Sequence, residues 1–263
     1  MTSLRKWFGT KEYSKIWCNL DFCGLLTFEF GEGVLFFALF YVGKHIIPVV
    51  FSSCLVRVIC YVLLFFLYTM AAVSHFRCAF TDPGAVPSDS TYCSGCSDED
   101  KLLFCVKCNA YKPPRAHHCS CCNRCIVRMD HHCPWTNNCI GYRNMKFFVL
   151  FLGYTLATCI FTIVMDCLQL FYIYKHIDDA ETKIMVLTMM TLSLAIIFMG
   201  FTGSMLSDTL DSIRMNTTGI DRLKGVNYSG ESGFRTYFGE RSSFSFRWLL
   251  PVLPHFINET SIR

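Results

Sequence analysis

Charge is scarce in this sequence. Only 17% of the 263 residues are charged, whereas 52% are hydrophobic and 16% are aromatic. A soluble domain of this length normally carries more charge, so the composition excludes that class and indicates a membrane protein. The net charge of +4 is modest and unevenly distributed, and it provides no basic footprint for nucleic acid. We therefore expect the lipid bilayer as a partner and no nucleic acid.

The sequence also lacks a cleavable signal peptide, internal repeats and low-complexity tracts. Residues 1–20 are polar, basic and aromatic, a pattern that does not direct secretion. Seventeen cysteines would suggest disulfides in a secreted protein, but ten of them lie between Cys93 and Cys139. This clustering favours zinc in a reducing compartment over a disulfide framework.

Four long apolar runs are the main feature that is present. Each run is long enough to cross the roughly 30 Å hydrocarbon core of a bilayer as a helix. They could also be core helices of a soluble protein, but too little polar sequence remains to cover all of them. We therefore expect an all-α polytopic membrane protein with four transmembrane helices, within residues 24–50, 53–75, 147–174 and 184–206.

The second run is followed by Pro83, Gly84 and Pro87, which cannot continue a helix. The expected order is a cytosolic N-terminal arm (1–23), transmembrane helices 1 and 2 (24–76), a cytosolic cysteine-rich zinc domain (77–146), transmembrane helices 3 and 4 (147–208) and a cytosolic C-terminal region (209–263). Residues 88–100 read as a mobile polar linker. Cys93 and Cys96, in this linker, have the spacing of a further metal pair.

The distribution of lysine and arginine predicts the orientation. Four lie in the N-terminal arm, nine between Arg77 and Lys146, and seven from Arg214 to the end, which leaves four elsewhere. Because cytoplasmic loops carry the excess of basic residues, both termini and the cysteine-rich segment are expected in the cytosol. The two remaining loops are then short and lumenal. This orientation agrees with the reducing compartment inferred from the cysteines.

The cysteine-rich segment has metal-ligand spacing. Two-residue gaps between cysteines let both thiolates reach one tetrahedral ion, and interleaved histidines suit zinc better than disulfides. Spacing alone does not choose between His117 and His118. Two ions can be bound with a residue left over, and a cysteine outside both four-ligand sites would be chemically free. The cysteines and histidines of this segment are Cys105, Cys108, His117, His118, Cys119, Cys121, Cys122, Cys125, His131, His132, Cys133 and Cys139.

This segment closely resembles the DHHC-type protein S-acyltransferases. The motif is Asp130-His131-His132-Cys133, preceded by Pro114 to Cys119 and followed by Pro134 to Gly141. The resemblance extends upstream to Asp82-Pro83-Gly84 and downstream to Thr218-Gly219-Ile220-Asp221, so it covers nearly the whole chain. His75-x-Arg77 with the motif after it is similar to the Golgi branch of the family, which implies an endomembrane location with the active site facing the cytosol.

The resemblance implies two closed, structural zinc sites. Binding of a structural zinc contributes roughly 10–16 kcal/mol to folding, and a segment with little apolar content needs that contribution. The implied ligands are Cys105, Cys108, His118 and Cys125 for one ion, and Cys119, Cys122, His132 and Cys139 for the other.

Cys133 then lies outside both sites and is the implied nucleophile. His131 is the candidate base, and Asp130 would orient it. The alternative is that Cys133 and His131 are further zinc ligands. In the implied reaction, Cys133 takes a long-chain acyl group from acyl-coenzyme A and passes it to a cysteine of a membrane-associated protein.

Other residues are assigned more loosely to the co-substrate. Lys112 and Arg115, close to the motif, would contact the phosphates of coenzyme A, although each could equally be a solvated or headgroup-binding charge. Trp135 would line the mouth of the acyl cavity or anchor the chain at the interface. Thr158 would lie at the end of the cavity, with its hydroxyl bonded to the carbonyl four residues earlier, or would be a plain helix-facing threonine.

The sequence departs from the family pattern in two places. Gly219 and Asp221 replace a threonine and a glutamate in an element that would brace the catalytic segment, and Gly233 stands where an asparagine is usual. Both contacts are therefore in doubt. Two other classes of protein compete with the transferase: a zinc-binding membrane adaptor without catalysis, and an iron or redox protein. No oligomeric state follows from the sequence.

Overall fold

The computed structural model describes residues 8–11, 16–87, 104–176, 181–226, 233–239 and 245–254. The linker expected at 88–100, with Cys93 and Cys96, lies outside these residues. The described chain divides into two compact units. We call them the cysteine-rich unit (residues 1–29, 74–149 and 209–263) and the helical unit (residues 30–73 and 150–208).

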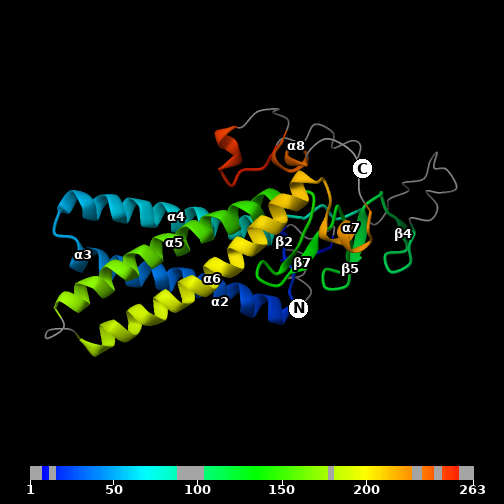
Figure 1. Cartoon of the computed structure of the whole chain (residues 1–263). Helices are drawn as coiled ribbons and strands as arrows, with labels where there is room; N and C mark the ends of the chain where they lie inside the picture. The colour runs from blue at the N-terminus through cyan, green and yellow to red at the C-terminus, as the bar shows by residue number, and fades with distance from the viewer. Residues whose placement is uncertain are drawn as a thin grey trace. The chain divides into compact units, whose positions relative to one another are not determined.

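Four helices are long and apolar enough to cross a membrane, which confirms the four expected spans (Figure 1). The first span begins with α2 (Phe22–Tyr41), passes through a π-helical turn, η1 (Val42–Ile46), and ends with α3 (Ile47–Val50). The others are α4 (Cys54–Phe80), α5 (Met145–Lys175) and α6 (Thr182–Arg214).

Two helices extend beyond the apolar runs that predicted them. α4 continues past His75 to Phe80, because the first residue that breaks the helix is Pro83. α6 continues past Leu206 to Arg214 through a polar stretch. The ends of an apolar run predict where a helix leaves the hydrocarbon core. They do not predict where the helix ends, because its backbone hydrogen bonds can continue through polar residues outside the membrane.

In the helical unit, the turn between the first two spans has a buried core. Tyr41, Ile46 and Ile47 pack against Leu64 of α4 and Met165 of α5. Arg57 of α4 donates hydrogen bonds to the carbonyls of Pro48 and Phe51. These bonds satisfy backbone oxygens that α3 leaves unpaired at its end.

The cysteine-rich unit contains pairs of short strands, and the sequence had predicted no secondary structure for its zinc domain. β1 (Phe8–Gly9) and β2 (Ile16–Trp17) are parallel. The cysteines and histidines lie on three antiparallel hairpins: β3 (Phe104–Cys105) with β4 (Ala110–Tyr111), β5 (Ala116–Cys119) with β6 (Arg124–Val127), and β7 (His131–Cys133) with β8 (Asn138–Ile140). The C-terminal part adds α7 (Gly219–Leu223), α8 (Phe234–Phe238) and the 3-10 turn η4 (Phe246–Trp248).

The segment after α4 lies along β6. Val86 donates a backbone hydrogen bond to Cys125 and Val127 donates one to Gly84, both over 2.8 Å. Asp82 accepts from the amides of Gly84 and Ala85, which forms the turn. The Asp-Pro-Gly motif thus joins α4 to the hairpin that carries Cys125.

A zinc-ligand framework beside a paired Cys-His-Asp group

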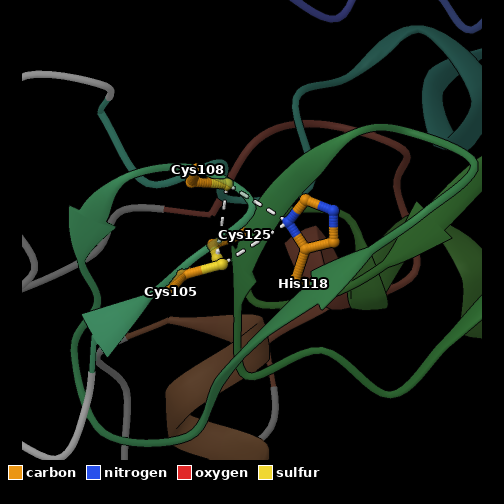
Figure 2. A group of neighbouring side chains, drawn as sticks. All are labelled: Cys105, Cys108, His118 and Cys125. Atoms are coloured by element: carbon orange, nitrogen blue, oxygen red, sulfur yellow. Dashed lines mark hydrogen bonds between the residues drawn. The ribbon is translucent and has the colours of Figure 1, made fainter.

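The first predicted zinc site is assembled in the cysteine-rich unit. The ligand atoms of Cys105, Cys108, His118 and Cys125 all lie within 4.8 Å of one another (Figure 2). Nδ1 of His118 is 3.7 Å from Sγ of Cys105 and 3.1 Å from Sγ of Cys108, and the sulfurs of Cys108 and Cys125 are 3.7 Å apart. Tetrahedral zinc would place two sulfurs about 3.8 Å apart, and a sulfur and a nitrogen about 3.6 Å apart. The site therefore fits zinc.

The second group fits more closely. Nδ1 of His132 lies 3.6 Å from Sγ of Cys119, 3.5 Å from that of Cys122 and 3.6 Å from that of Cys139. The sulfurs of Cys122 and Cys139 are 3.5 Å apart. Zn²⁺ held by three thiolates and one imidazole has no open position, so zinc here would stabilise the fold and leave the chemistry to other groups.

Hairpin register explains the ligand sets. His118 pairs with Cys125, and His132 pairs with Cys139, so each imidazole faces the last cysteine of its own site. Asn109 and Asn123 follow Cys108 and Cys122 with φ angles of 51° and 52°. Asparagine tolerates this left-handed conformation better than most residues, which allows the tight turns that direct both thiolates inward.

The structure resolves the choice between His117 and His118. His118 supplies Nδ1 to the first group, whereas His117 belongs to neither group, and its buried Nε2 has no hydrogen-bond partner among the described residues. Burial and the charges of Lys224 and Lys112 lower the pKa of His117 to about 4. His117 is thus neutral at physiological pH.

Cys133 lies outside both ligand groups, as predicted. It ends β7, and its side chain is 4% exposed. His131 is two residues earlier on the same strand, so the two side chains share a face. Nδ1 of His131 donates to Oδ2 of Asp130 over 2.8 Å. The other ring nitrogen of His131, Nε2, is buried and has no partner of normal hydrogen-bond geometry among the described residues.

The electrostatics of this group favour a thiolate beside an imidazolium. Burial would lower the pKa of His131, but hydrogen bonding to Asp130 and the proximity of Cys133 outweigh it and raise the pKa to about 9. Burial likewise opposes ionisation of Cys133, and the neighbouring His131 lowers its pKa below the usual thiol value.

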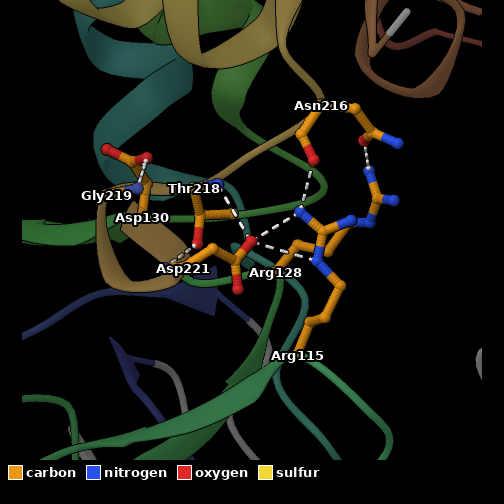
Figure 3. A network of polar contacts seen from close by, with 7 residues as sticks. All are labelled: Arg115, Arg128, Asp130, Asn216, Thr218, Gly219 and Asp221. Carbon is orange, nitrogen blue, oxygen red and sulfur yellow. Dashed lines mark hydrogen bonds and ion pairs between the residues drawn. The ribbon is translucent and has the colours of Figure 1, made fainter. Parts of the chain in front are cut away.

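A polar network anchors Asp130 (Figure 3). The amide of Gly219 donates to Oδ1 of Asp130 over 2.6 Å, so both carboxylate oxygens of Asp130 are bonded. Thr218 and Asp221 form a reciprocal capping box at the start of α7. Arg115 donates to Oδ2 of Asp221 over 2.6 Å and to the carbonyl of Asn216 over 2.8 Å.

The element that was expected to brace the catalytic segment is therefore in contact with it, although Gly219 and Asp221 replace the usual threonine and glutamate. A backbone amide makes the contact at residue 219, so no threonine hydroxyl is needed there. A Cβ at Gly233 would lie 2.7 Å from the carbonyl oxygen of Ile213, to which the Gly233 amide donates over 2.9 Å. Glycine at residue 233 thus allows a close backbone contact that a side chain would obstruct.

The residues predicted to contact acyl-coenzyme A differ in burial and in hydrogen-bond partners. Arg115 is bonded to Asp221, and Lys112 and Trp135 are half-buried. Lys146, another basic residue near the motif, is buried, and its Nζ donates to the carbonyls of Arg247 and Val252. Thr158 belongs to the helical unit, is 2% exposed, and donates to the carbonyl of Tyr154 over 2.8 Å, as predicted.

The residues that hold the chain after Cys133 were not predicted from the sequence. Thr27 of α2 donates to the carbonyl of Pro134 over 2.6 Å, and His75 of α4 donates to that of Trp135 over 2.8 Å. Asn138 donates to the carbonyls of Cys78, Ala79 and Thr81 at the end of α4. The only signal in the sequence is the group of asparagines that follows the motif.

Comparison with known proteins agrees with this geometry. A family model described as DHHC palmitoyltransferase matches residues 98–226. Palmitoyltransferase ZDHHC3-A of Danio rerio is 32% identical over an alignment of 264 positions, gaps included, which covers 90% of this chain and 79% of the relative. The chain belongs to the DHHC palmitoyltransferase family.

Further relatives carry similar names. Probable protein S-acyltransferase 12 of Arabidopsis thaliana is 34% identical over 208 residues, covering 71% of this chain and 70% of the relative. Palmitoyltransferase ZDHHC7 of Rattus norvegicus is 33% identical over 201 residues, covering 71% and 65% respectively. Membership of the DHHC palmitoyltransferase family supports protein S-acyltransferase activity and disfavours the iron or redox alternative.

Proposed function

We propose that the protein is a protein S-palmitoyltransferase that moves a long-chain acyl group from acyl-coenzyme A to cysteine thiols of membrane-associated proteins. The observation that carries the proposal is a buried thiol, Cys133, excluded from two complete ligand groups and placed beside His131, which is paired with Asp130. A zinc-binding adaptor would require the ligand groups but not this pairing.

In the first step, the Cys133 thiolate attacks the carbonyl carbon of the acyl-coenzyme A thioester. A carbon–sulfur bond to Cys133 forms, the bond to coenzyme A breaks, and the released thiolate takes a proton from the His131 imidazolium. In the second step, a substrate thiol returns a proton to His131 and takes the acyl group. Cys133 leaves as a thiolate, which restores the starting state.

Each step exchanges one thioester for another, so the reaction free energy is small. The rate therefore depends mainly on how the reacting groups are positioned. Asp130 fixes the orientation of the His131 ring and stabilises its charged form, as the carboxylate does in a catalytic triad. Gly219 in turn holds Asp130. Thr27 and His75 hold the backbone after Cys133, so its Sγ is presented from a fixed turn.

The two zinc ions would be structural. The residues that would hold them are the two Cys₃His groups, which include the strand neighbour of Cys133, His132. A zinc at this site would fix the backbone of β7 and so the position of Cys133.

We further propose that Lys112 binds a phosphate of coenzyme A, that Trp135 borders the acyl chain, and that Thr158 limits its length. Arg115 can contribute to phosphate binding only through protons not used by Asp221 and Asn216. The excess of basic residues in the terminal and cysteine-rich segments supports a site facing the cytosol. The resemblance around His75 and Arg77 supports an endomembrane location, the Golgi in particular.

A transfer assay tests this function. Purified protein in detergent is incubated with labelled palmitoyl-coenzyme A and a cysteine-containing lipidated peptide. We expect label on the peptide that neutral hydroxylamine removes, as it does from a thioester. A serine version of the peptide is the control. Absence of transfer by a protein that contains both zinc ions would favour the adaptor.

A further inference from the structure

One buried face of α5 in the helical unit is polar. Its residues recur every three or four positions, so they lie on one side of the helix. None is more than 4% exposed. A membrane-spanning helix is expected to be apolar, and polar groups inside it usually serve a function. The residues are Thr155, Thr158, Thr162, Asp166 and Gln169.

Most of this face lacks hydrogen-bond partners. Oδ2 of Asp166, Oε1 of Gln169 and Oγ1 of Thr162 are buried and unpaired within the described part of the chain. Thr191 of α6 donates to the other carboxylate oxygen, Oδ1 of Asp166, over 3.0 Å. Oγ1 of Thr155 on the same face is unpaired as well. An unpaired buried polar group destabilises a fold by roughly 1–3 kcal/mol, so four such oxygens on one helix face indicate an occupant.

Nearby donors are already bonded elsewhere. The hydroxyl of Thr188, one turn before Thr191, donates to the carbonyl of Ile184 over 2.8 Å and contacts the hydroxyl of Tyr41 at 2.7 Å. Among the described residues, no ion pair involves Asp166, which is 0% exposed. The carboxylate therefore has one hydrogen bond and no counter-ion from the protein, a combination that is costly in an apolar interior.

We propose that Asp166, Gln169, Thr162 and Thr191 form a binding site for an alkali-metal cation between α5 and α6. All the available ligand atoms are oxygens, which suit hard cations and not transition metals. A single carboxylate neutralises one positive charge, whereas a divalent ion would leave a net charge in the membrane interior. The cation would satisfy the unpaired oxygens and link the two helices.

The site belongs to the helical unit and the proposed chemistry to the cysteine-rich unit, so its effect is expected on the stability of the helical unit. Asp166 is about 14 Å, or nine residues, from the C-terminal end of α5 at a rise of 1.5 Å per residue. A ligand that binds only the folded state raises the melting temperature. Once the site is largely filled, each tenfold increase in ligand adds the same increment of stability.

Thermal unfolding of the full-length protein in neutral detergent tests the site. A thiol-reactive fluorogenic dye reports unfolding, because most of the described cysteines are buried, Cys60 and Cys159 of the helical unit among them. Sodium chloride replaces choline chloride at constant ionic strength, and a parallel series uses potassium chloride. We expect sodium, potassium or both to raise the melting temperature, by a constant increment for each tenfold increase in concentration once the site is largely filled. Choline should have no such effect, because it is too large for the site.

Two variants test whether the stabilisation by alkali cations comes from the site at Asp166. Asp166→Asn, which keeps the shape of the side chain, should lose the response to the alkali cation. Thr202→Val is the matched control, because its buried hydroxyl donates to the carbonyl of Phe198 in its own helix, and it should respond as the wild type does. If Asp166→Asn does not purify, Gln169→Leu replaces it and should weaken the response.

Three results would overturn the proposal. The first is a wild-type melting temperature that is the same in sodium, potassium and choline. The second is an equal response of wild type and Asp166→Asn, which would place the cation elsewhere. The third is stabilisation by acidification without any response to alkali cations, which would assign a proton to Asp166. None of these outcomes affects the proposed acyl transfer, which is measured separately.

Discussion

The amide of Gly219 donates a 2.6 Å hydrogen bond to Oδ1 of Asp130, which joins the segment after the fourth span to the Asp-His-His-Cys motif. The other oxygen of Asp130 accepts from His131. Residues 89 positions apart in sequence thus act on one imidazole. Because Oδ1 is occupied, the carboxylate cannot rotate away from the ring.

Removing this amide should slow acylation without unfolding the protein. Gly219 is the first residue of α7, where proline is tolerated, and the extended conformation of Thr218 suits a residue before proline. Gly219→Pro should reduce the rate of self-acylation by about tenfold to a hundredfold, since a hydrogen bond to a charged group contributes roughly 1.5–3 kcal/mol.

Gly219→Ala is the matched control for that experiment, because it keeps the amide. A Cβ there would lie 3.2 Å from the carbonyl oxygen of Asp130, so a small effect is expected. Equal rates for the proline variant and the wild type would show that Asp130 needs no support from residue 219.

The ion pair between Arg115 and Asp221 should make stability depend on pH. Burial opposes ionisation of Asp221, but hydrogen bonds from the Thr218 backbone and from Arg115 outweigh it and lower the pKa. A lowered folded-state pKa stabilises the protein above the unfolded pKa of about 3.9. This contribution is lost as pH falls through the folded value.

Asp221→Asn should therefore be less stable than wild type at pH 7, by roughly 3 kcal/mol, because it leaves a buried guanidinium unpaired. The difference should narrow as pH falls below about 4. Denaturant unfolding at several pH values measures it. A difference that does not change with pH would mean that Asp221 acts only as a helix cap.

Metal analysis should find two zinc ions per chain. A variant that lacks one ligand should differ in zinc content from a variant of a cysteine outside both groups. Cys139→Ala removes one ligand of the second group, so it should lose one zinc and destabilise the cysteine-rich unit. Cys121→Ala is the control, because Cys121 is exposed and lies outside both groups. Loss of zinc from Cys121→Ala would show that the ligand sets are wrong.

The motif was visible in the sequence, and the resemblance implied the eight ligands, but residue spacing alone could not give the strand phase. Successive side chains on a strand point to opposite faces, so only one of His117 and His118 can face Cys125. Spacing does not show which one. The structure shows His118 there, and also shows that the segment folds as hairpins.

Contacts between residues far apart in the chain could not be predicted from the sequence either. Arg115 was predicted to bind phosphate because of its place near the motif. The sequence does not show that it also pairs with Asp221, 106 residues away. The polar spacing that leads to Asp166 is visible in the sequence of α5. The sequence does not show that its carboxylate is unpaired, since that depends on what α6 presents to it.

Acyl-chain preference should depend on residue 158 if Thr158 limits the cavity. Wild type should accept 16- and 18-carbon chains with little bias, whereas Thr158→Tyr should lose the longer chain. Each displaced methylene lowers binding by about 0.8 kcal/mol. Thr158→Val is the size-matched control, because it removes only the hydroxyl bond to Tyr154. Competition between 14-, 16- and 18-carbon acyl-coenzyme A in self-acylation measures it, and an unchanged preference in Thr158→Tyr would exclude this residue from the cavity.

The central claim is that Cys133 is a free nucleophile held beside two structural zinc sites. The most direct measurement incubates wild type and Cys133→Ser with labelled palmitoyl-coenzyme A, locates the acyl group by mass spectrometry, and determines zinc content in the same samples. We predict a hydroxylamine-sensitive acyl group on Cys133 of the wild type, none at residue 133 of the variant, and two zinc ions in both proteins. Loss of zinc or unfolding of Cys133→Ser would contradict the account, because Cys133 would then be a metal ligand.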